Sequence, residues 1–473
     1  MIAVHVTSEV YPFSRTGMLG DSVFGLAKSQ ASLGLDTVVF SPMYTSAGCY
    51  EPYDLVQGRD ITVYAAGICY FFTTFSTQLD GVRYVFFNNE ELYNRRYIYG
   101  TSSYDYSDND IRYGMFCMAA LQYIREENIQ PDIIHCHEWQ AGLVPVYKHL
   151  FYEDIKAKIV FTIHDITFQG VFGKFSIQSL GLPWEMYNIE ELEFYENISL
   201  LKGGATHSDF ITLLSPTYAK EVQTEENSFG LGSFMAKFED RIEGILGGID
   251  YDRFNPETDQ FIKMNYNADT VQHKLVNKED FLSETGLGNT ELPLFLLETK
   301  FTERKGLELL ADCADKLAEI PANFAILGYG EPKFCSKFKE IANNHNNVFT
   351  SIGISESMLH KAYAAADFVL RPSLSDPCGK SQMLGMRYGA LPVVRRTGGL
   401  IDTVVDIEDG GYGFFMDGYS RHDLIKQINR AVDFFQNKAI LFEYAAKVMR
   451  LDFSWMRTAE KFILLYQRIL GGS

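Results

Sequence analysis

The sequence predicts an α/β protein made of two doubly wound domains. Short apolar runs alternate with helical patterns along almost all of the 473 residues, as in parallel sheets covered by helices. This series of runs occurs twice, and a polar, poorly periodic region from about Asp259 to Thr290 separates the two series. The length also exceeds that of one ordinary domain, since domains have roughly 100–200 residues.

Apolar runs predict the strands of both domains. In the first domain they are Ile2–Ser8, Thr37–Ser41, Arg83–Asn88, Ile133–His137, Lys158–His164 and Phe210–Ser215. In the second domain they are Leu292–Thr299, Phe324–Leu327, Val348–Ile352, Phe368–Leu370 and Leu391–Arg395. Several are continuous stretches of Val, Ile and Phe, which is typical of strands buried on both faces of a sheet.

We expect the first domain to span residues 1–243, the second 244–453, and a C-terminal helix 454–473. The boundary falls near Gly244–Pro256, after the first series of strands has ended. The final stretch is predicted to be an amphipathic helix. Its apolar residues are Trp455, Met456, Ala459, Phe462, Ile463 and Tyr466.

The charge balance argues against two classes of partner. The formal net charge is −19, and a strongly acidic chain lacks the positive surface that nucleic acids and anionic membranes require. The amino terminus does not have the features of a signal peptide, and no run of 18 apolar residues predicts a membrane span. The seven scattered cysteines form no CxxC pair, which is typical of reduced thiols in a cytoplasmic protein.

Three strand-to-helix loops have the composition of phosphate-binding turns. The first is Arg15-Thr16-Gly17-Met18-Leu19-Gly20-Asp21, where glycines would let backbone N–H groups approach a phosphate at a helix start. An ordinary turn with Asp21 as the helix cap also explains this loop. The other two loops are Ser373–Gln382 and Arg395–Leu400. Three such turns in one chain favour a phosphate-containing ligand.

A fourth loop, Lys300–Gly306, carries three cations within six residues. Cations are unfavourable at the start of a helix, so their placement favours an anion site over a solvated helix start.

His164 ends an apolar run and is expected at the carboxyl end of its strand, where open α/β sheets bind ligands. A lone histidine at such a position can also be structural. The pairs in Asp108-Asn109-Asp110 and Asp250-Tyr251-Asp252 match a metal-binding pattern that is too common to predict a metal site.

These loops are among the segments in which the chain resembles the bacterial glycogen synthases and plant starch synthases. The matching segments are SEVYPFSRTGMLGDSV, HCHEWQAGLVPV, FTIHDITFQGVF, LLSPTYAKEVQT, GILGGIDYDRFNP, TERKGLELL, DPCGKSQMLGMRYG and VVRRTGGLIDTVVD. The resemblance implies the GT-B fold, in which two Rossmann-like domains face a central cleft and the final helix crosses back onto the first domain. It also implies transfer of glucose from ADP-glucose to the non-reducing end of an α-1,4-glucan.

The resemblance further implies the residues of the site. Catalytic roles fall to His164, Lys300, Lys305 and Asp376, and acceptor-side contacts to Glu138, Trp139 and Gln140. The donor would be bound by Arg15, Gly17, Met18, Gly247, Ile354, Cys378, Gly379, Lys380, Ser381, Thr397 and Gly398. No cofactor and no metal are implied.

Most departures from the family pattern fall within these motifs, while the scaffold segments agree. The departures are at Arg15, Met18, Glu138, Gln140, Gly247, Lys300, Ile354, Asp376 and Lys380, whereas His164, Lys305, Gly379, Thr397, Gly398 and Gly399 match. Met18 adds a side chain where the family has glycine, and Asp376 is one methylene shorter than the usual glutamate. This distribution indicates either changed specificity or relaxed catalysis.

The implied reaction is a retaining transfer. Lys300 and Lys305 would neutralise charge on the leaving phosphates. His164 would orient the glucose and stabilise the cationic sugar through its backbone carbonyl, and Asp376 would hold glucose hydroxyls.

Two alternative classes of function remain. The clustered departures favour a paralogue with changed donor or acceptor specificity, or a catalytically weak glucan-binding or regulatory protein. An oxidoreductase would need a GxGxxG turn, which is missing from the sequence.

Overall fold

The computed structural model describes residues 1–101 and 104–471, which form two compact units. Unit 1 comprises residues 1–214 and 219–248 and the chain from Trp455 onward. Unit 2 comprises residues 215–218 and 249–454. The chain therefore passes into unit 2 after Gly248, a few residues beyond the expected end of the first domain, and its last helix belongs to unit 1.

Unit 1 is built around a nine-stranded sheet with the order β12-β11-β7-β6-β1-β2-β5-β4-β3. The strands from β12 to β5 are parallel, and all six predicted strands of this domain are among them. The bounds are β1 Ile2–Val6, β2 Asp36–Pro42, β3 Val56–Ala65, β4 Ile68–Leu79, β5 Val82–Asn88, β6 Ile133–His137, β7 Lys158–Ile163, β11 Phe210–Leu213 and β12 Ile242–Gly244.

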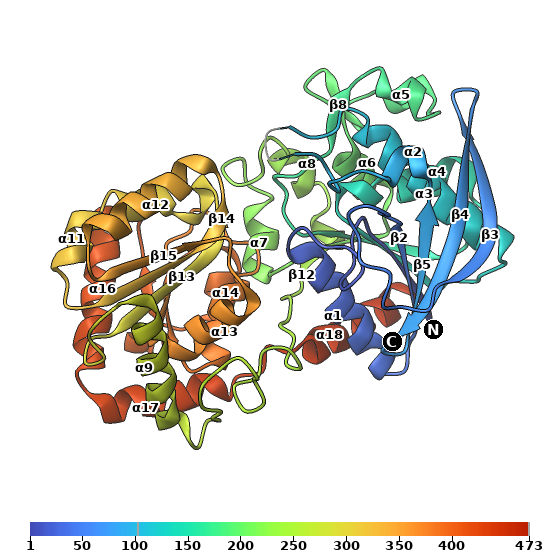
Figure 1. Cartoon of the computed structure of the whole chain (residues 1–473). Helices are drawn as coiled ribbons and strands as arrows, with labels where there is room; N and C mark the ends of the chain where they lie inside the picture. The colour runs from blue at the N-terminus through green and yellow to red at the C-terminus, as the bar shows by residue number, and fades with distance from the viewer. Residues whose placement is uncertain (102–103, 472–473) are drawn as a thin grey trace. The chain divides into compact units, whose positions relative to one another are not determined.

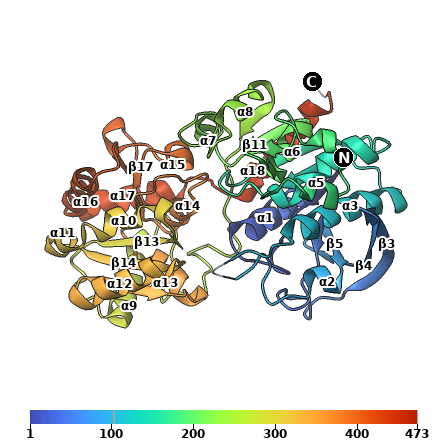
Figure 2. The same cartoon turned by 90° about the horizontal axis from the view of Figure 1, so that it is seen from above.

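The antiparallel strands β3 and β4 extend this sheet beyond β5 and were not predicted (Figure 2). The outer strand β3 begins with five exposed residues, so it lacks the continuous apolar run that marks a strand buried on both faces. Unit 1 also contains a small antiparallel sheet that was not predicted, formed by β8 Val171–Gly173, β10 Asn197–Ser199 and β9 Glu193–Phe194.

Helices pack around the large sheet. The α-helices of unit 1 are α1 Met18–Ser32, α2 Glu90–Tyr93, α3 Asn109–Glu126, α4 Leu143–Phe151, α5 Ser176–Ser179, α6 Leu200–His207, α8 Gly232–Ala236 and α18 Trp455–Ile469. Short 3-10 turns are η1 Trp139–Ala141, η2 Trp184–Met186 and η3 Glu239–Arg241. Helix α7, Pro216–Glu221, has residues in both units.

The C-terminal helix α18 packs beside α1 (Figure 1). Its buried residues Trp455, Phe462 and Tyr466 join an apolar cluster with residues of the central strands. The predicted helix is confirmed, but the predicted apolar face is wrong in part. Met456 is exposed and Leu465 is buried instead, because the buried stripe follows positions three and four apart from Trp455.

Unit 2 contains a six-stranded sheet of parallel strands in the order β15-β14-β13-β16-β17-β18. This is the doubly wound order 3-2-1-4-5-6, which reverses direction between β13 and β16. The bounds are β13 Leu294–Phe301, β14 Asn323–Gly330, β15 Val348–Ile352, β16 Phe368–Arg371, β17 Leu391–Arg395 and β18 Phe414–Met416. All five predicted strands are present.

Helices cover both faces of this sheet (Figure 1). Helix α10 packs against α12, and helix α9 packs against α13. Their bounds are α9 Lys274–Thr285, α10 Leu307–Ala311, α11 Ala314–Glu319, α12 Pro332–Asn344, α13 Glu356–Ala365, α14 Lys380–Arg387, α15 Gly398–Thr403, α16 Arg421–Phe435 and α17 Lys438–Met449. The 3-10 turns are η4 Val271–His273, η5 Glu303–Lys305 and η6 Ile407–Asp409.

Helix α9 lies in the region that was expected to be poorly periodic. Its buried face includes two lysines, so the apolar pattern that predicts a helix is weak there. Lys274 donates hydrogen bonds of 2.8–3.1 Å to the carbonyls of Tyr363, Ala364 and Tyr388. Lys278 forms a buried 2.7 Å ion pair with Asp367. Polar contacts therefore hold this helix where apolar contacts would be expected.

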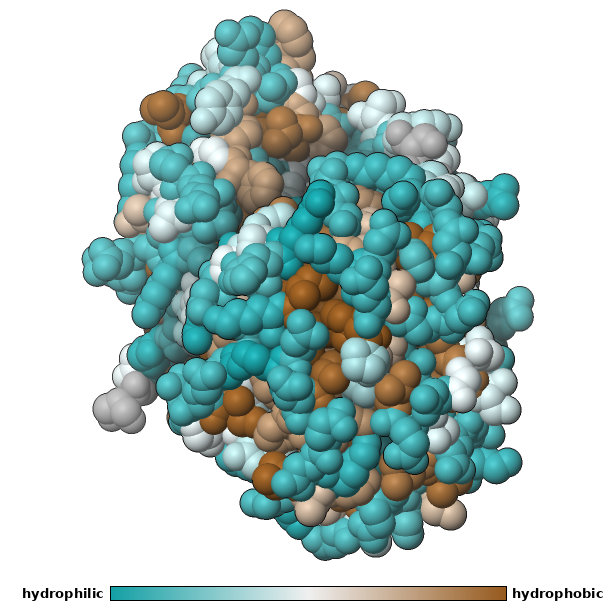
Figure 3. Space-filling view, turned by 90° about the vertical axis from the view of Figure 1, so that its left-hand side faces the viewer, coloured by the Kyte–Doolittle hydropathy of each residue, from teal (hydrophilic) through white to brown (hydrophobic). Residues whose placement is uncertain are grey.

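Among the described residues, no helix combines the length and the apolar character needed to cross a bilayer. The face shown in Figure 3 is mostly hydrophilic, with hydrophobic residues gathered in separate patches. All seven cysteines are free thiols.

Candidate active site

The loops after β13 and β16 meet at the point where the sheet of unit 2 reverses its strand order, which is where such sheets bind ligands. The backbone N–H of Leu374 donates to the carbonyl of Arg304 at 2.8 Å. Gly306 has φ +74°, and a Cβ there would lie 2.0 Å from the carbonyl oxygen of Pro372. Glycine is therefore required for the two loops to approach this closely.

These loops bring together Lys305 and Asp376, two of the predicted catalytic residues. The Nζ of Lys305 lies 3.2 Å from one carboxylate oxygen of Asp376. Arg371 and Ser373 bind the other oxygen, at 2.5 Å and 3.2 Å. Burial acts to raise the pKa of Asp376, but the charges of Lys305 and Arg371 hold it well below its usual range. The carboxyl group is therefore ionised and compensated by two cations.

Arg371 and Glu298 complete this group and were not predicted. Arg371 donates to the backbone carbonyl of Glu298 at 2.7 Å. The hydroxyl of Ser381 donates to the Glu298 carboxylate at 2.8 Å, so this predicted donor-binding hydroxyl makes a bond within the protein. Arg371 follows directly on a predicted strand, and a cation at the end of a buried strand is the signal that could have identified it.

The starts of helices α14 and α15 also converge. Gly379, with φ +72°, caps α14, and Thr397 caps α15. The N–H of Gly399 donates to the backbone carbonyl of Asp376 at 3.0 Å, and a Cβ on Gly399 would lie 2.1 Å from the carbonyl oxygen of Cys378. Two helix amino termini close together suit a negatively charged ligand.

The other predicted residues of unit 2 lie around this group. Lys300 is exposed near the end of β13, and Lys380 and Gly398 are the first residues of α14 and α15. Ile354 is half-buried and follows β15, the edge strand, which β14 separates from β13.

In unit 1, Glu138 holds the backbone at His164. Glu138 follows β6 with φ +63°, an uncommon conformation for a residue with a side chain. Its Oε1 accepts hydrogen bonds from the N–H groups of His164 at 2.6 Å and Asp165 at 2.8 Å. Its Oε2 is buried and has no hydrogen-bond partner among the described residues. Burial, with a contribution from the charge of Asp165, raises the pKa of Glu138 to about 8.

Replacing Glu138 by glutamine should remove the loss of stability that the wild type suffers at this residue as the pH rises. The unfolded carboxyl ionises near pH 4.5, whereas the folded one stays protonated until about pH 8, so the wild type loses stability as the pH rises between these values. Glutamine keeps the Oε1 acceptor and carries no charge. The variant should gain roughly 3–5 kcal/mol relative to the wild type between pH 5 and pH 8.

Urea unfolding followed by tryptophan fluorescence tests this, because all three tryptophans lie in unit 1. Glu226→Gln, at an exposed position, is the matched control. Its free energy of unfolding should differ from that of the wild type by the same amount at pH 5 and at pH 8. A difference between Glu138→Gln and the wild type that stays constant with pH would contradict the neutral state of Glu138.

His164 lies at the carboxyl end of β7, half-buried, and its Nε2 is 3.2 Å from Nδ1 of His137. Burial lowers the pKa of His164 to about 3, so the ring is neutral. Gly247, a predicted donor-binding residue, lines a cavity of about 10 Å³ together with His164 and His137. This cavity has room for about one water molecule and none for a sugar.

The loop after β1 has a defined conformation. Gly17 caps α1, and Thr16 donates from its hydroxyl to the buried carboxylate of Glu9 at 3.0 Å. Asp21 was considered as the cap, but it lies in the first turn, where it pairs with Arg15 at 3.2 Å. Met18 is 49% exposed, so its side chain stands in solvent at the start of α1.

The predicted acceptor-side residues Trp139 and Gln140 are both buried. The indole of Trp139 packs on Gly170, where a Cβ would lie 2.6 Å from the ring, and against Tyr113 and Phe172. The Oε1 of Gln140 is buried without a hydrogen-bond partner in the described part of the chain.

The comparisons with known proteins agree along the whole chain. Residues 3–237 match the starch synthase catalytic domain family, and residues 279–447 match the glycosyl transferases group 1 family. The chain is 36% identical to a glycogen synthase of Aquifex aeolicus over 470 residues, covering 99% of each protein. It is 34% identical to a glycogen synthase of Geobacillus stearothermophilus over 482 residues, covering 99% of this chain and 98% of the relative.

The solved structures agree with these relatives. The catalytic domain of starch synthase IV from Arabidopsis thaliana, bound to ADP and acarbose, superposes with a TM-score of 0.91 at 30% identity and 99% coverage of both chains. A sucrose-phosphate synthase from Thermosynechococcus elongatus, with a TM-score of 0.62 at 16% identity, shares the fold alone. The predicted GT-B fold is confirmed, and the chain belongs to the glycogen and starch synthase family of glycosyltransferases.

Proposed function

We propose that this glycosyltransferase transfers glucose, with retention of configuration, from ADP-glucose to the non-reducing end of an α-1,4-glucan. The observation that carries the proposal is the group of Lys305, Asp376 and Arg371 where the sheet of unit 2 reverses its strand order, beside two converging helix starts. The starch synthase IV structure, which binds ADP and acarbose, supports a nucleotide donor and a glucan acceptor.

The residues of unit 2 suit the donor phosphates. Lys305 would neutralise charge on the leaving diphosphate, assisted by Lys300 and by backbone N–H groups at the starts of α14 and α15. Cys378, Gly379, Lys380, Ser381, Thr397 and Gly398 belong to these two starts. Ile354 would lie beside the nucleotide base. We propose residues 244–453 as the donor domain on these grounds.

The residues of unit 1 suit the sugars. Glu138 holds the backbone of His164, whose carbonyl would stabilise the cationic sugar. Arg15, Gly17, Met18 and Gly247 complete the proposed donor contacts, and Glu138, Trp139 and Gln140 are assigned to the acceptor side. The buried state of Trp139 and Gln140 indicates that they shape this region more than they contact a glucan directly. We propose residues 1–243 as the acceptor-side domain.

Asp376 has a second role in this proposal. Its carboxylate is already bound by Lys305, Arg371 and Ser373, so it positions Lys305 as well as offering an acceptor to glucose hydroxyls. The transfer needs no covalent nucleophile, because the leaving phosphate can take the proton of the acceptor hydroxyl on the same face of the sugar. No cofactor is proposed. The seven free cysteines support a reducing, cytoplasmic location.

Radiolabel transfer from ADP-[14C]glucose or UDP-[14C]glucose to a maltooligosaccharide tests the proposal. Chain elongation should be faster from ADP-glucose, and the new linkage should be α-1,4. Preference for the uridine donor would indicate changed donor specificity. Transfer from neither donor at high enzyme concentration would contradict the proposal and favour a glucan-binding or regulatory protein.

A further inference from the structure

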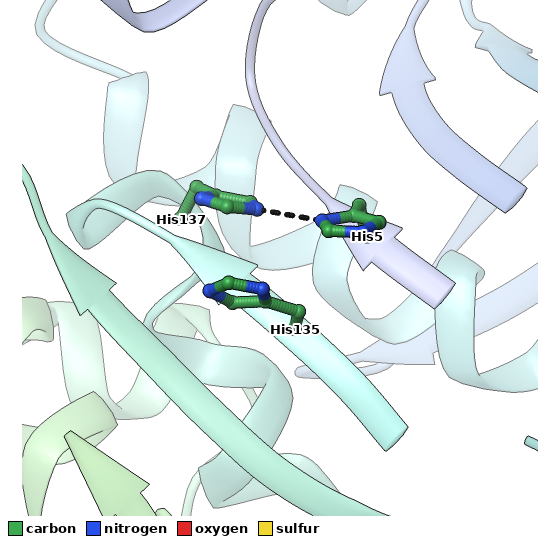
Figure 4. A group of neighbouring side chains, drawn as sticks. All are labelled: His5, His135 and His137. Atoms are coloured by element: carbon green, nitrogen blue, oxygen red, sulfur yellow. Dashed lines mark hydrogen bonds between the residues drawn. The ribbon is translucent and has the colours of Figure 1, made fainter. Parts of the chain in front are cut away.

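Three fully buried histidines form a cluster in the centre of unit 1. His5 lies on β1, and His135 and His137 lie on the neighbouring strand β6 (Figure 4). His5 pairs with His135 in the sheet register, and His135 and His137 share a face because they are two residues apart on a strand. One nitrogen of each ring lies within 4.8 Å of one nitrogen of each of the other two. This cluster was not predicted, although the His-Cys-His spacing on a buried strand was its signal.

The arrangement of the rings favours hydrogen bonding over metal binding. All six ring nitrogens of these histidines lie within hydrogen-bond distance of another polar atom. The rings of His135 and His137 are stacked, with centroids 4.2 Å apart and planes at 29°. The lone pairs of a ring lie in its plane, so those of two stacked rings do not converge on one ion at the roughly 2.0–2.1 Å that zinc requires.

The hydrogen bonds form a continuous relay that leads to His164. Oε1 of Gln30, on α1, is 2.7 Å from Nε2 of His5. Nδ1 of His5 is 3.0 Å from Nε2 of His137, and Nδ1 of His137 is 3.2 Å from Nε2 of His164. A residue on the first helix is therefore connected through two buried rings to a proposed catalytic residue.

The direction of every bond in this branch follows from the amide of Gln30. Its Nε2 donates to the hydroxyl of Tyr466 at 3.1 Å, so its Oε1 faces His5 as an acceptor. His5 must then donate from Nε2, which makes its Nδ1 an acceptor in the neutral ring. His137 must therefore donate from Nε2 to Nδ1 of His5, and His164 must donate from Nε2 to Nδ1 of His137. The lone pair of His164 is therefore on Nδ1.

A second branch starts from the same amide of Gln30. The hydroxyl of Tyr466, on α18, accepts from Gln30 and so donates to Nδ1 of His135 at 2.6 Å. His135 then donates from Nε2 to the hydroxyl of Thr162 at 2.5 Å. Because the hydroxyl of Thr162 accepts from His135, its O–H donates a hydrogen bond to the hydroxyl of Thr212, also at 2.5 Å. Each group in both branches has one donor and one acceptor role, and no assignment conflicts with another.

We infer that Gln30 and Tyr466 are positioning residues that hold His164 in one orientation and in the Nε2–H tautomer. The Nδ1 lone pair of His164 is then available to accept a hydrogen bond from a sugar hydroxyl. The C-terminal helix thereby acts on a catalytic residue through the sheet. The effect on turnover rests on the proposed glucosyl transfer, whereas the tautomer does not.

The environment supports neutral rings. Burial lowers the pKa of His5 to about 4, and it also lowers the pKa values of His135 and His137 well below their ordinary value. A neutral imidazole has one donor and one acceptor, as the relay requires, whereas a charged ring has two donors.

The tautomers can be observed directly by long-range ¹⁵N–¹H correlation spectra of the full chain labelled with ¹⁵N-histidine. His164→Gln identifies the His164 signals by their loss. In the wild type, His5, His135, His137 and His164 should all be Nε2–H tautomers. Tyr466→Phe releases the Gln30 amide, so His164 should show mixed tautomers, and kcat should fall about tenfold, in the range for losing an orienting partner, with KM for the donor unchanged.

Phe462→Leu is the matched control. Phe462 lies on the same helix and in the same apolar cluster as Tyr466, but its side chain has no polar atom and so takes no part in the relay. It should lower stability and leave the His164 tautomer unchanged. An Nδ1–H tautomer of His164 in the wild type would overturn the inference, as would unchanged tautomers in Tyr466→Phe or one equivalent of zinc bound in the purified protein. If no donor supports transfer, the spectra still decide the tautomer while the proposed function fails.

Discussion

Replacing Lys305 by alanine should reduce glucosyl transfer about 10²–10³-fold, which is the usual cost of removing one group that stabilises developing charge. The loss should fall on kcat, because the charge on the leaving diphosphate grows as the sugar bond breaks. The fold should survive, since Arg371, which binds the carboxylate of Asp376 at 2.5 Å in the wild type, would still compensate its charge. Steady-state kinetics with ADP-glucose and a maltooligosaccharide measure the effect.

Lys316→Ala is the matched control, because Lys316 is an exposed lysine in the same unit. It should keep the activity of the wild type. Thermal unfolding of both variants verifies that they are folded. A Lys305→Ala variant that is folded and keeps more than about a tenth of the wild-type kcat would contradict the proposed role, because such a loss is smaller than one stabilising contact contributes.

Acid should destabilise unit 1 through its buried histidines. The ordinary histidine pKa is 6.5, whereas burial lowers that of His5 to about 4 and that of His164 to about 3. Below pH 6.5 the unfolded chain therefore binds protons that the folded chain does not bind. The stability is complete above pH 6.5 and is lost as the pH falls towards 4. For His5 alone the loss amounts to about 3 kcal/mol.

The groups that contact His5 are Gln30 on α1 and His135 and His137 on β6. Tyr466 on α18 is connected to His5 through its hydrogen bond with Gln30. No carboxylate is among these neighbours, so no nearby negative charge stabilises a proton on the ring. Glu138 acts in the opposite direction over part of this range, because its raised pKa favours the folded state at low pH. Several histidines contribute with one sign, so acid lability should prevail.

Urea unfolding at a series of pH values between about 7 and 4.5 tests this expectation, with tryptophan fluorescence as the readout of unit 1. His5→Gln should give a shallower dependence of the free energy of unfolding on pH. The slope is compared and not the absolute value, so a general destabilisation by the substitution does not affect the result. His422→Gln, at an exposed position in unit 2, should match the wild-type slope. Equal slopes for all three proteins would contradict the prediction.

Part of the site could be predicted because it depends on local sequence. The loops at Lys305, Asp376 and Thr397 were found from their positions after buried strands, since parallel strands place such loops at one edge of a sheet. The position of Arg371 at the end of a buried strand was readable in the sequence, but its contact with Glu298 was not, because the two residues are far apart in the chain. Neither was the hydrogen bond from the hydroxyl of Ser381 to Glu298.

The sequence by itself determined the fold class and the strands that are buried on both faces, because continuous apolar runs report burial without reference to the rest of the chain. It did not determine the half-exposed strand β3 or the helix α9, whose buried face carries Lys274 and Lys278. Only the tertiary structure placed His5 beside His137 and joined both to Tyr466. Such contacts depend on the order and register of strands, and hydrogen-bond partners distant in the chain leave no periodic pattern in the sequence.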